Sequence, residues 1–150
     1  MSSLPLSFAL KELSSRNAAI AAIYREWARR LQPGPVTRLA WSIAEQRLDL
    51  GKALSEIAAD RSLPEVDVEF ESTIASAAGV DAGEATLADS KAILKKIAEA
   101  EASDHELLAA VAGAVVPSSG PVAERLASEA ASARKRSIWA QDQLELLSML

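Results

Sequence analysis

The only histidine of this 150-residue chain, His105, lies one helical turn after Glu101 in the segment KKIAEAEASDHELLAAVAG, residues 95–113. Side chains four residues apart share a helix face, so this pair could bind one zinc or iron ion, with solvent or a partner's side chains completing the coordination. The alternative is a hydrogen-bonded pair inside a helical bundle, where imidazolium beside carboxylate avoids an isolated buried charge. Both interpretations predict a helix here.

Other residue types exclude several kinds of chemistry. With no cysteine, the chain forms no disulfide, iron–sulfur cluster or thiolate nucleophile. It contains neither a glycine-rich phosphate loop nor a serine in the nucleophile-elbow pattern. Acid–base catalysis by Glu101 and His105 needs a substrate pocket, whereas alanine-lined helix seams pack tightly. The sequence therefore favours a protein that is not an enzyme and needs no cofactor.

The basic and aromatic residues allow two expectations about surfaces. The densest basic run is ARKRS, residues 133–137, which we expect to form a solvated helix face, with a small-anion or partner site as the alternative. Trp27, Trp41 and Trp139 lie in three different predicted helices and are typical of core or interface anchors. We expect a homodimer that uses one tryptophan, and a further protein partner remains open.

The overall charge argues against nucleic acid as a partner. Sixteen Lys and Arg residues against 21 Asp and Glu give a net charge of −5. The first residues, MSSLPLSFALKELSSRN, have no basic region and reach Lys11 and Glu12 before any apolar run is long enough for a signal peptide or membrane span. We therefore expect a cytoplasmic protein that binds no membrane.

The elements that must position these residues are helices. Apolar spacing of three and four, broken by Pro33-Gly34-Pro35 and by the Pro117 to Pro121 turn, predicts an all-α single domain over 1–150. The predicted helices are about 7–31, 35–59, 86–115 and 122–148. Residues 60–85 show no sustained period. So long a connection favours two helical hairpins joined by a crossover, with simple up-down topology as the alternative.

The two predicted hairpins read as diverged copies of each other. Residues about 84 apart match in type along the first and third predicted helices, and the Gly-Pro-Val breaks match at an offset of 86. The matched pairs include Leu10-Lys11 with Leu94-Lys95, Leu13 with Ile97, Asn17 with Glu101, Tyr24 with Leu108, and Ala28 with Ala112. Chance similarity of alanine-rich helices is the alternative.

This repeat predicts which polar groups face the bundle centre. Asn17 and Glu101 fall on seven-residue rows of otherwise apolar positions, and His105 falls on the same side of its helix as Glu101. On the second helix the predicted row runs through Ile43, Gln46 and Leu50. The sequence thus predicts a polar seam of Asn17, Gln46, Glu101 and His105.

With these features the chain resembles the ferritin-like superfamily, most closely the rubrerythrin-type four-helix domain. The resemblance spans nearly all 150 residues through the duplicated hairpin, the crossover with DVEFESTIASA, and the phrases IAEAEASDHELLAAVA and RLASEAASA. In that family, a Glu followed seven residues later by Tyr on helices one and three, and Glu-x-x-His on helices two and four, hold two irons.

The resemblance implies that most of this ligand set is missing here. On the first and third helices, Asn17 stands in place of Glu and Leu108 in place of Tyr, whereas Tyr24 and Glu101 match the family pattern. One Glu of the expected ligands is therefore retained on these helices.

The second and fourth helices retain none of their ligands. Ile43 and Gln46 stand where the family has Glu-x-x-His, as do Ala130 and Ala133, and no shift of register restores a histidine. The resemblance therefore implies a ferritin-like protein that has lost its di-iron centre and acts in binding or assembly. Two alternatives stay open, namely a residual iron- or zinc-binding oxidoreductase or storage protein, and a plain helical interaction module.

Overall fold

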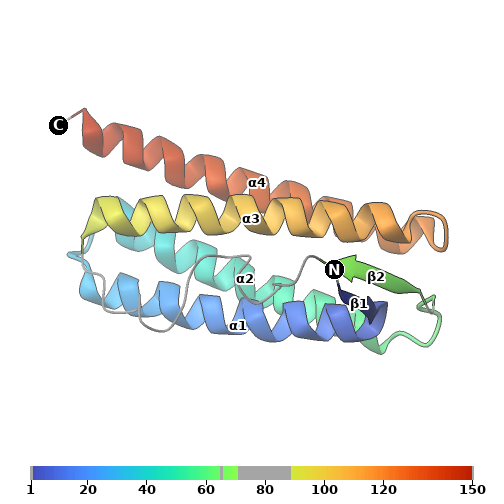
Figure 1. Ribbon diagram of the computed structural model, residues 1–150. Coiled ribbons are helices and arrows are strands. Elements are labelled where there is room, and N and C mark those ends of the chain that lie inside the picture. Colours follow the sequence, from blue (N-terminus) through green and yellow to red (C-terminus); the bar gives the residue numbers. More distant parts are fainter. Residues whose placement is uncertain (1, 65, 71–88, 150) are drawn as a thin grey trace.

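The computed structural model describes residues 2–64, 66–70 and 89–149, and these residues form a bundle of four helices with one small strand pair (Figure 1). The elements are β1 (Ser2–Pro5), α1 (Leu6–Arg30), α2 (Pro35–Ala59), β2 (Asp67–Phe70), α3 (Ser90–Val115) and α4 (Gly120–Ser148). The prediction of an all-α protein is confirmed, and the predicted bounds of the first, second and fourth helices lie close to the observed ones. The start predicted for the third helix, residues 86–88, lies outside the described residues.

Local sequence signals explain where the helices begin. Pro35 opens α2 and Pro121 lies in the first turn of α4, where a residue without an N–H is tolerated. The side chain of Asp89 accepts a hydrogen bond from the N–H of Ala92 at 3.0 Å and so caps α3. The Ser119 hydroxyl caps α4 in the same way.

The helices form two antiparallel hairpins, α1 with α2 and α3 with α4, stacked on each other (Figure 1). Figure 1 also shows that α2 and α3 run in the same direction, so α2 ends at one end of the bundle and α3 begins at the other. This parallel course of α2 and α3 is the one expected for two hairpins joined by a crossover, whereas simple up-down topology would make α2 and α3 antiparallel.

The strand pair was not predicted. β1 and β2 pair antiparallel, with Leu4 opposite Val68, and the N–H of Leu6 donates to the carbonyl of Val66 at 2.8 Å. The apolar alternation in DVEF is too short to stand out from the connection around it. The pairing ties the start of α1 to the segment after α2, and Val68 is buried there against the core.

Two apolar clusters fill the bundle, one toward each end. The first includes Tyr24, Trp27 and Ile43, and the second includes Leu10 and Leu54. Between them lies a layer that contains buried polar and charged side chains. The charged side chains of this central layer are therefore the candidates for a functional site.

The exposed fraction differs among the three tryptophans. Trp27 is fully buried in the first cluster, whereas Trp41 is 38 % and Trp139 is 45 % exposed. No helix in the described part of the chain combines the length and the apolar character needed to cross a membrane.

In each hairpin the two helices contact each other closely at one point, and the residues at these two points occupy corresponding positions of the sequence repeat. In the first hairpin the Ser14 hydroxyl donates to the Gly51 carbonyl at 2.6 Å, and a Cβ on Gly51 would lie 3.2 Å from the carbonyl oxygen of Ser14. In the second hairpin the Ser137 hydroxyl donates to the Ala98 carbonyl at 2.8 Å. Ala98 follows Ser14 by 84 residues and Ser137 follows Gly51 by 86, the offsets found in the sequence. The hairpins thus cross at matching residues.

Candidate functional site

Four charged side chains meet in the central layer, and we call them the buried ion-pair cluster. They are Arg47 from α2, Glu101 and Asp104 from α3, and Arg136 from α4, and none is more than 3 % exposed. Each of them lies on the buried face of its helix, among apolar residues. The cluster holds two guanidinium and two carboxylate groups, so its formal charges balance.

Glu101 is the centre of this cluster. Its Oε2 accepts hydrogen bonds from Nη2 of Arg47 and, at 3.0 Å, from the hydroxyl of Tyr24 on α1. Its Oε1 accepts from Nε of Arg136. One carboxylate thereby joins side chains from α1, α2 and α4 to α3. Hydrogen bonds to ionised groups are among the stronger ones in proteins, and here they are shielded from water.

Asp104 is less completely bonded than Glu101. Its Oδ2 lies 3.1 Å from Nη1 of Arg47 and 3.8 Å from Nη2 of Arg136, and it makes no hydrogen bond of good geometry. Burial raises the pKa of Asp104 above its ordinary value, because the lost hydration outweighs the attraction of Arg47.

Arg47 is held from several sides. Its Nη1 donates to Oδ1 of Asn17 at 2.6 Å, and the Nδ2 of Asn17 donates in turn to the Leu13 carbonyl at 2.7 Å. The guanidinium carbon lies 5.9 Å from the centre of the Tyr24 ring, within cation–π range. Burial alone lowers the pKa of Arg47, but Asp104 and Glu101 more than offset this and raise it, so the side chain stays charged.

The structure brings together two of the four residues of the predicted polar seam. Asn17 and Glu101 are both buried, and Arg47 bridges them. Gln46 lies partly exposed beside this position, and its amide donates weakly to the Ser42 hydroxyl at 3.4 Å. The inward-facing residue of α2 is therefore Arg47, one position after the one predicted.

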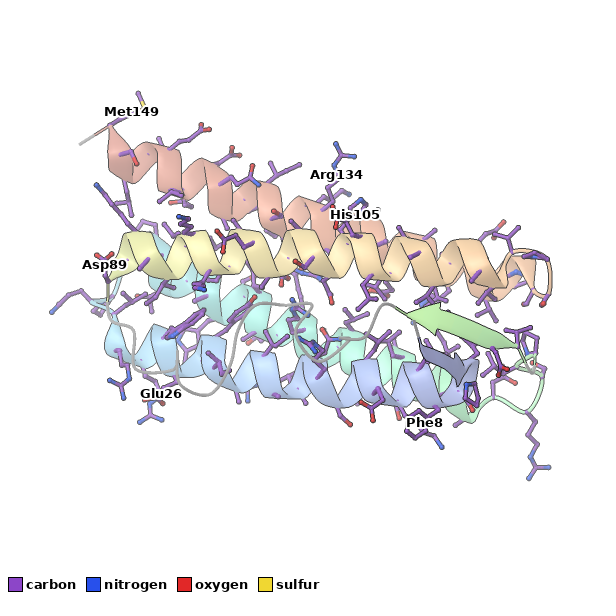
Figure 2. The ribbon with its side chains drawn as sticks, viewed as in Figure 1. Phe8, Glu26, Asp89, His105, Arg134 and Met149 are labelled. Carbon is purple, nitrogen blue, oxygen red and sulfur yellow. The ribbon has the colours of Figure 1, made fainter. Side chains whose placement is uncertain are left out.

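His105 lies away from the cluster. Its Nδ1 is 2.8 Å from the carbonyl oxygen of Ala130 on α4, and because a carbonyl only accepts, this nitrogen carries the proton. The ring is partly exposed and lines a surface hollow together with Arg134, and Figure 2 shows the two side chains near each other on the α3–α4 hairpin. No hydrogen bond between His105 and Glu101 occurs among the described residues.

Sequence reasoning missed Arg47, Asp104 and Arg136. The expectation that ARKRS forms a solvated face is wrong for Arg136, which is 2 % exposed. The physical reason is that Arg136 lies between Ala133 and Ala140 on the buried row of α4 and finds a counter-charge in Glu101. A charged residue at a core spacing is the signal that could have identified it.

These residues do not fit a di-iron centre. Such a centre needs several free carboxylate oxygens together with imidazole. Both oxygens of Glu101 are occupied by guanidinium groups. Within residues 2–64, 66–70 and 89–149, no three His, Cys, Asp or Glu side chains gather closely enough to hold a metal ion.

Tyr24 offers a direct probe of the cluster, because it is the only tyrosine in the chain. Burial and then the carboxylate of Glu101 raise the pKa of Tyr24 well above its ordinary value. Above about pH 10 the unfolded chain releases a proton that the folded chain retains, so the free energy of unfolding falls with rising pH by up to about 1.4 kcal/mol per unit. Tyr24→Phe should remove this part of the slope.

The measurement is the ultraviolet absorbance of tyrosinate, recorded with the circular dichroism of the helices during an alkaline titration. We expect tyrosinate to form only as helicity is lost, whereas in concentrated urea it should form near pH 10. Tyrosinate that forms near pH 10 while the helices persist would contradict the burial of this hydroxyl.

Comparison with known proteins finds no match to this chain. No protein-family model matches the chain, no curated protein matches it significantly, and neither does any solved structure.

Proposed function

We propose that this chain is a rubrerythrin-like member of the ferritin-like proteins that has lost its di-iron centre and acts, without catalysis, in binding or assembly. The observation that carries the proposal is the position of Arg47 and Arg136, whose guanidinium groups both bond Glu101 in the bundle centre. The matching close approaches of the two hairpins and the parallel course of α2 and α3 support the fold assignment.

The charges in the central layer support the absence of a metal-dependent activity. In a di-iron bundle, carboxylates offset the charge of two metal cations. Here two guanidinium cations lie against Glu101 and Asp104, and Asn17 and Ala133 supply no negative charge. A metal ion that entered this layer would meet two like charges and a carboxylate that is already fully bonded. The arginines thus replace the metals as the partners of the retained Glu.

We further propose that the chain acts as a homodimer in the cytoplasm and contacts its copy or another protein through an exposed tryptophan. Trp41 and Trp139 are the two tryptophans with substantial exposed area. Large aromatic side chains are enriched at protein interfaces because they bury much apolar area with few rotatable bonds. Sedimentation of the wild type and of Trp139→Ala tests this step, and a monomer at all concentrations would contradict it.

The experiment that tests the lost centre is elemental analysis of protein expressed with added iron or zinc and purified without chelator. We expect substoichiometric metal in the wild type and in His105→Ala. Stoichiometric iron or zinc that disappears in His105→Ala would overturn the proposal and favour a residual metalloprotein. His105 is the better site for this variant, because Glu101→Ala would also disturb folding.

A further inference from the structure

A row of exposed residues runs along the outer side of α4, and we call it the outer α4 row. Its members are spaced alternately four and three residues apart, and they are Gly120, Glu124, Ala127, Ala131, Arg134 and Ile138. This is the spacing of a helix seam that contacts a second helix, yet all six residues are exposed to solvent. At 1.5 Å per residue the row is about 27 Å long. Trp139, one of the two exposed tryptophans, borders it.

A hollow of about 630 Å³ lies beside this row, between α3 and α4. Ala109 and Gly113 line it from α3, and Ala127 and Ala131 line it from α4. Outside its own helix backbone, a Cβ on Gly113 would have no atom of the described residues within 4 Å, so the packing of this chain does not require glycine there. Glycine inside a helix is less favourable than alanine, but small side chains let a second helix pack closely. The hollow is therefore suited to receive a helix.

Opposite charges flank the two alanines of the row. Glu124 comes three residues before Ala127, and Arg134 comes three residues after Ala131. Neither Glu124 nor Arg134 pairs with an opposite charge in the described part of the chain, and Figure 2 shows Arg134 directed away from the bundle. The row therefore presents an unpaired anion and an unpaired cation on either side of a small apolar centre.

We propose that the outer α4 row is the contact surface of a homodimer, in which α4 packs antiparallel against α4 of a second copy. This inference rests on the homodimer proposed above and assigns its surface. Glu124 and Arg134 each lie five residues from position 129, so antiparallel pairing centred there places Glu124 of each copy opposite Arg134 of the other. Parallel pairing in register would instead place like charges opposite each other, which is repulsive. The charges thus select the antiparallel arrangement.

The uncharged members of the row fit the same arrangement. Ala127 and Ala131 each lie two residues from position 129 and therefore meet at the centre of the contact. Gly120 and Ile138 each lie nine residues from it, so the Ile138 side chain, 43 % exposed in one chain, packs over a residue without a side chain. A Cβ on Gly120 would have no atom of the described residues within 4 Å, which leaves room for this isoleucine. Two-fold symmetry forms each pair twice.

Sedimentation of the full chain tests this contact with charge-swapped variants. Glu124→Arg and Arg134→Glu should each weaken dimerisation by roughly tenfold or more, because each swap creates two like-charge contacts across the interface. The double variant that carries both swaps should dimerise nearly as well as wild type, since opposite charges face each other again. Arg38→Glu, at an exposed arginine of α2 outside the row, is the matched control and should dimerise like wild type. All of these positions are exposed, so none of the variants should unfold the chain.

Disulfide cross-linking tests the orientation. The chain contains no cysteine, so Ala127→Cys and Ala131→Cys each introduce a single thiol. In a mixture of the two variants we expect disulfides to link unlike chains in preference to like chains, because antiparallel pairing places Ala127 opposite Ala131. Preferential linkage of like chains would overturn the antiparallel contact.

The sedimentation results separate this contact from the homodimer on which it rests. A dimer that persists unchanged in both single swaps would overturn the contact through α4 and leave the homodimer standing. Weakening by both single swaps without recovery in the double variant would overturn the pairing of Glu124 with Arg134. A wild-type chain that is monomeric at all concentrations would overturn the homodimer itself, and the contact with it.

Discussion

Replacement of Arg47 with leucine is expected to lower the free energy of unfolding by about 3–5 kcal/mol, the usual effect of removing one partner from a buried ion pair. The variant leaves Arg136 as the only cation beside Glu101 and Asp104, and it removes the donor to Oδ1 of Asn17. Two desolvated carboxylates would then share one guanidinium, and the buried amide oxygen would lack a partner.

Urea denaturation of this variant, followed by circular dichroism, measures the loss. Arg30→Leu is the matched control, because Arg30 pairs with Glu26 on the surface of α1 at 3.1 Å and is 42 % exposed. Surface pairs contribute about 0–1 kcal/mol, so the control should stay near wild type. Similar losses in both variants would show that the charges of the cluster are not desolvated in solution.

The second expected result is recovery of stability when the whole cluster becomes apolar. Its substitutions are Arg47→Met, Glu101→Leu, Asp104→Leu and Arg136→Met, with Asn17→Leu and Tyr24→Phe to remove the polar groups that would lose their partners. Concerted replacement of buried ion pairs by apolar side chains of similar volume is often neutral or stabilising by about 1–4 kcal/mol. We therefore expect this variant to be at least as stable as wild type, although Arg47→Leu alone is strongly destabilised.

The same denaturation series compares the two variants directly. Recovery would show that the cluster adds little net stability and is retained for another reason, such as fixing one arrangement of the helices. A multiple variant as unstable as Arg47→Leu would instead show that the ion pairs themselves stabilise the bundle. Dispersion of the amide resonances separates a packed apolar core from a loosely ordered one.

Much of the fold could be predicted because its signals are local. Pro33 follows the end of α1, and Pro35 and Pro121 lie in the first turns of α2 and α4, because proline is tolerated there but not inside a helix. Apolar residues spaced three and four apart predict the helices and the faces that they bury. Asn17 and Glu101 were assigned to the interior for that reason, and both are buried. The small strand pair escaped prediction because it depends on two short segments far apart in the chain.

The candidate site could be predicted only in part, because its main residues are arginines. An arginine in a sequence is normally assigned to the surface, since burying its charge is unfavourable without a partner. For Arg47 and Arg136 that partner is Glu101 on a different helix, which no local pattern reveals. Gln46 was predicted in place of Arg47 because it falls on the helical row of Ile43 and Leu50, whereas the buried position of α2 is the next residue.

Glu101 receives hydrogen bonds from α1 and α2 of one hairpin and from α4 of the other. This geometry fixes the longitudinal alignment of the hairpins, since sliding one of them by a single turn would separate Tyr24 and Arg47, the two donors of the first hairpin, from Glu101. The same bonds would form if the second hairpin came from another chain, because nothing in them depends on covalent continuity. The charged layer therefore dictates how two hairpins align while leaving hairpin exchange between copies open as a route to a dimer.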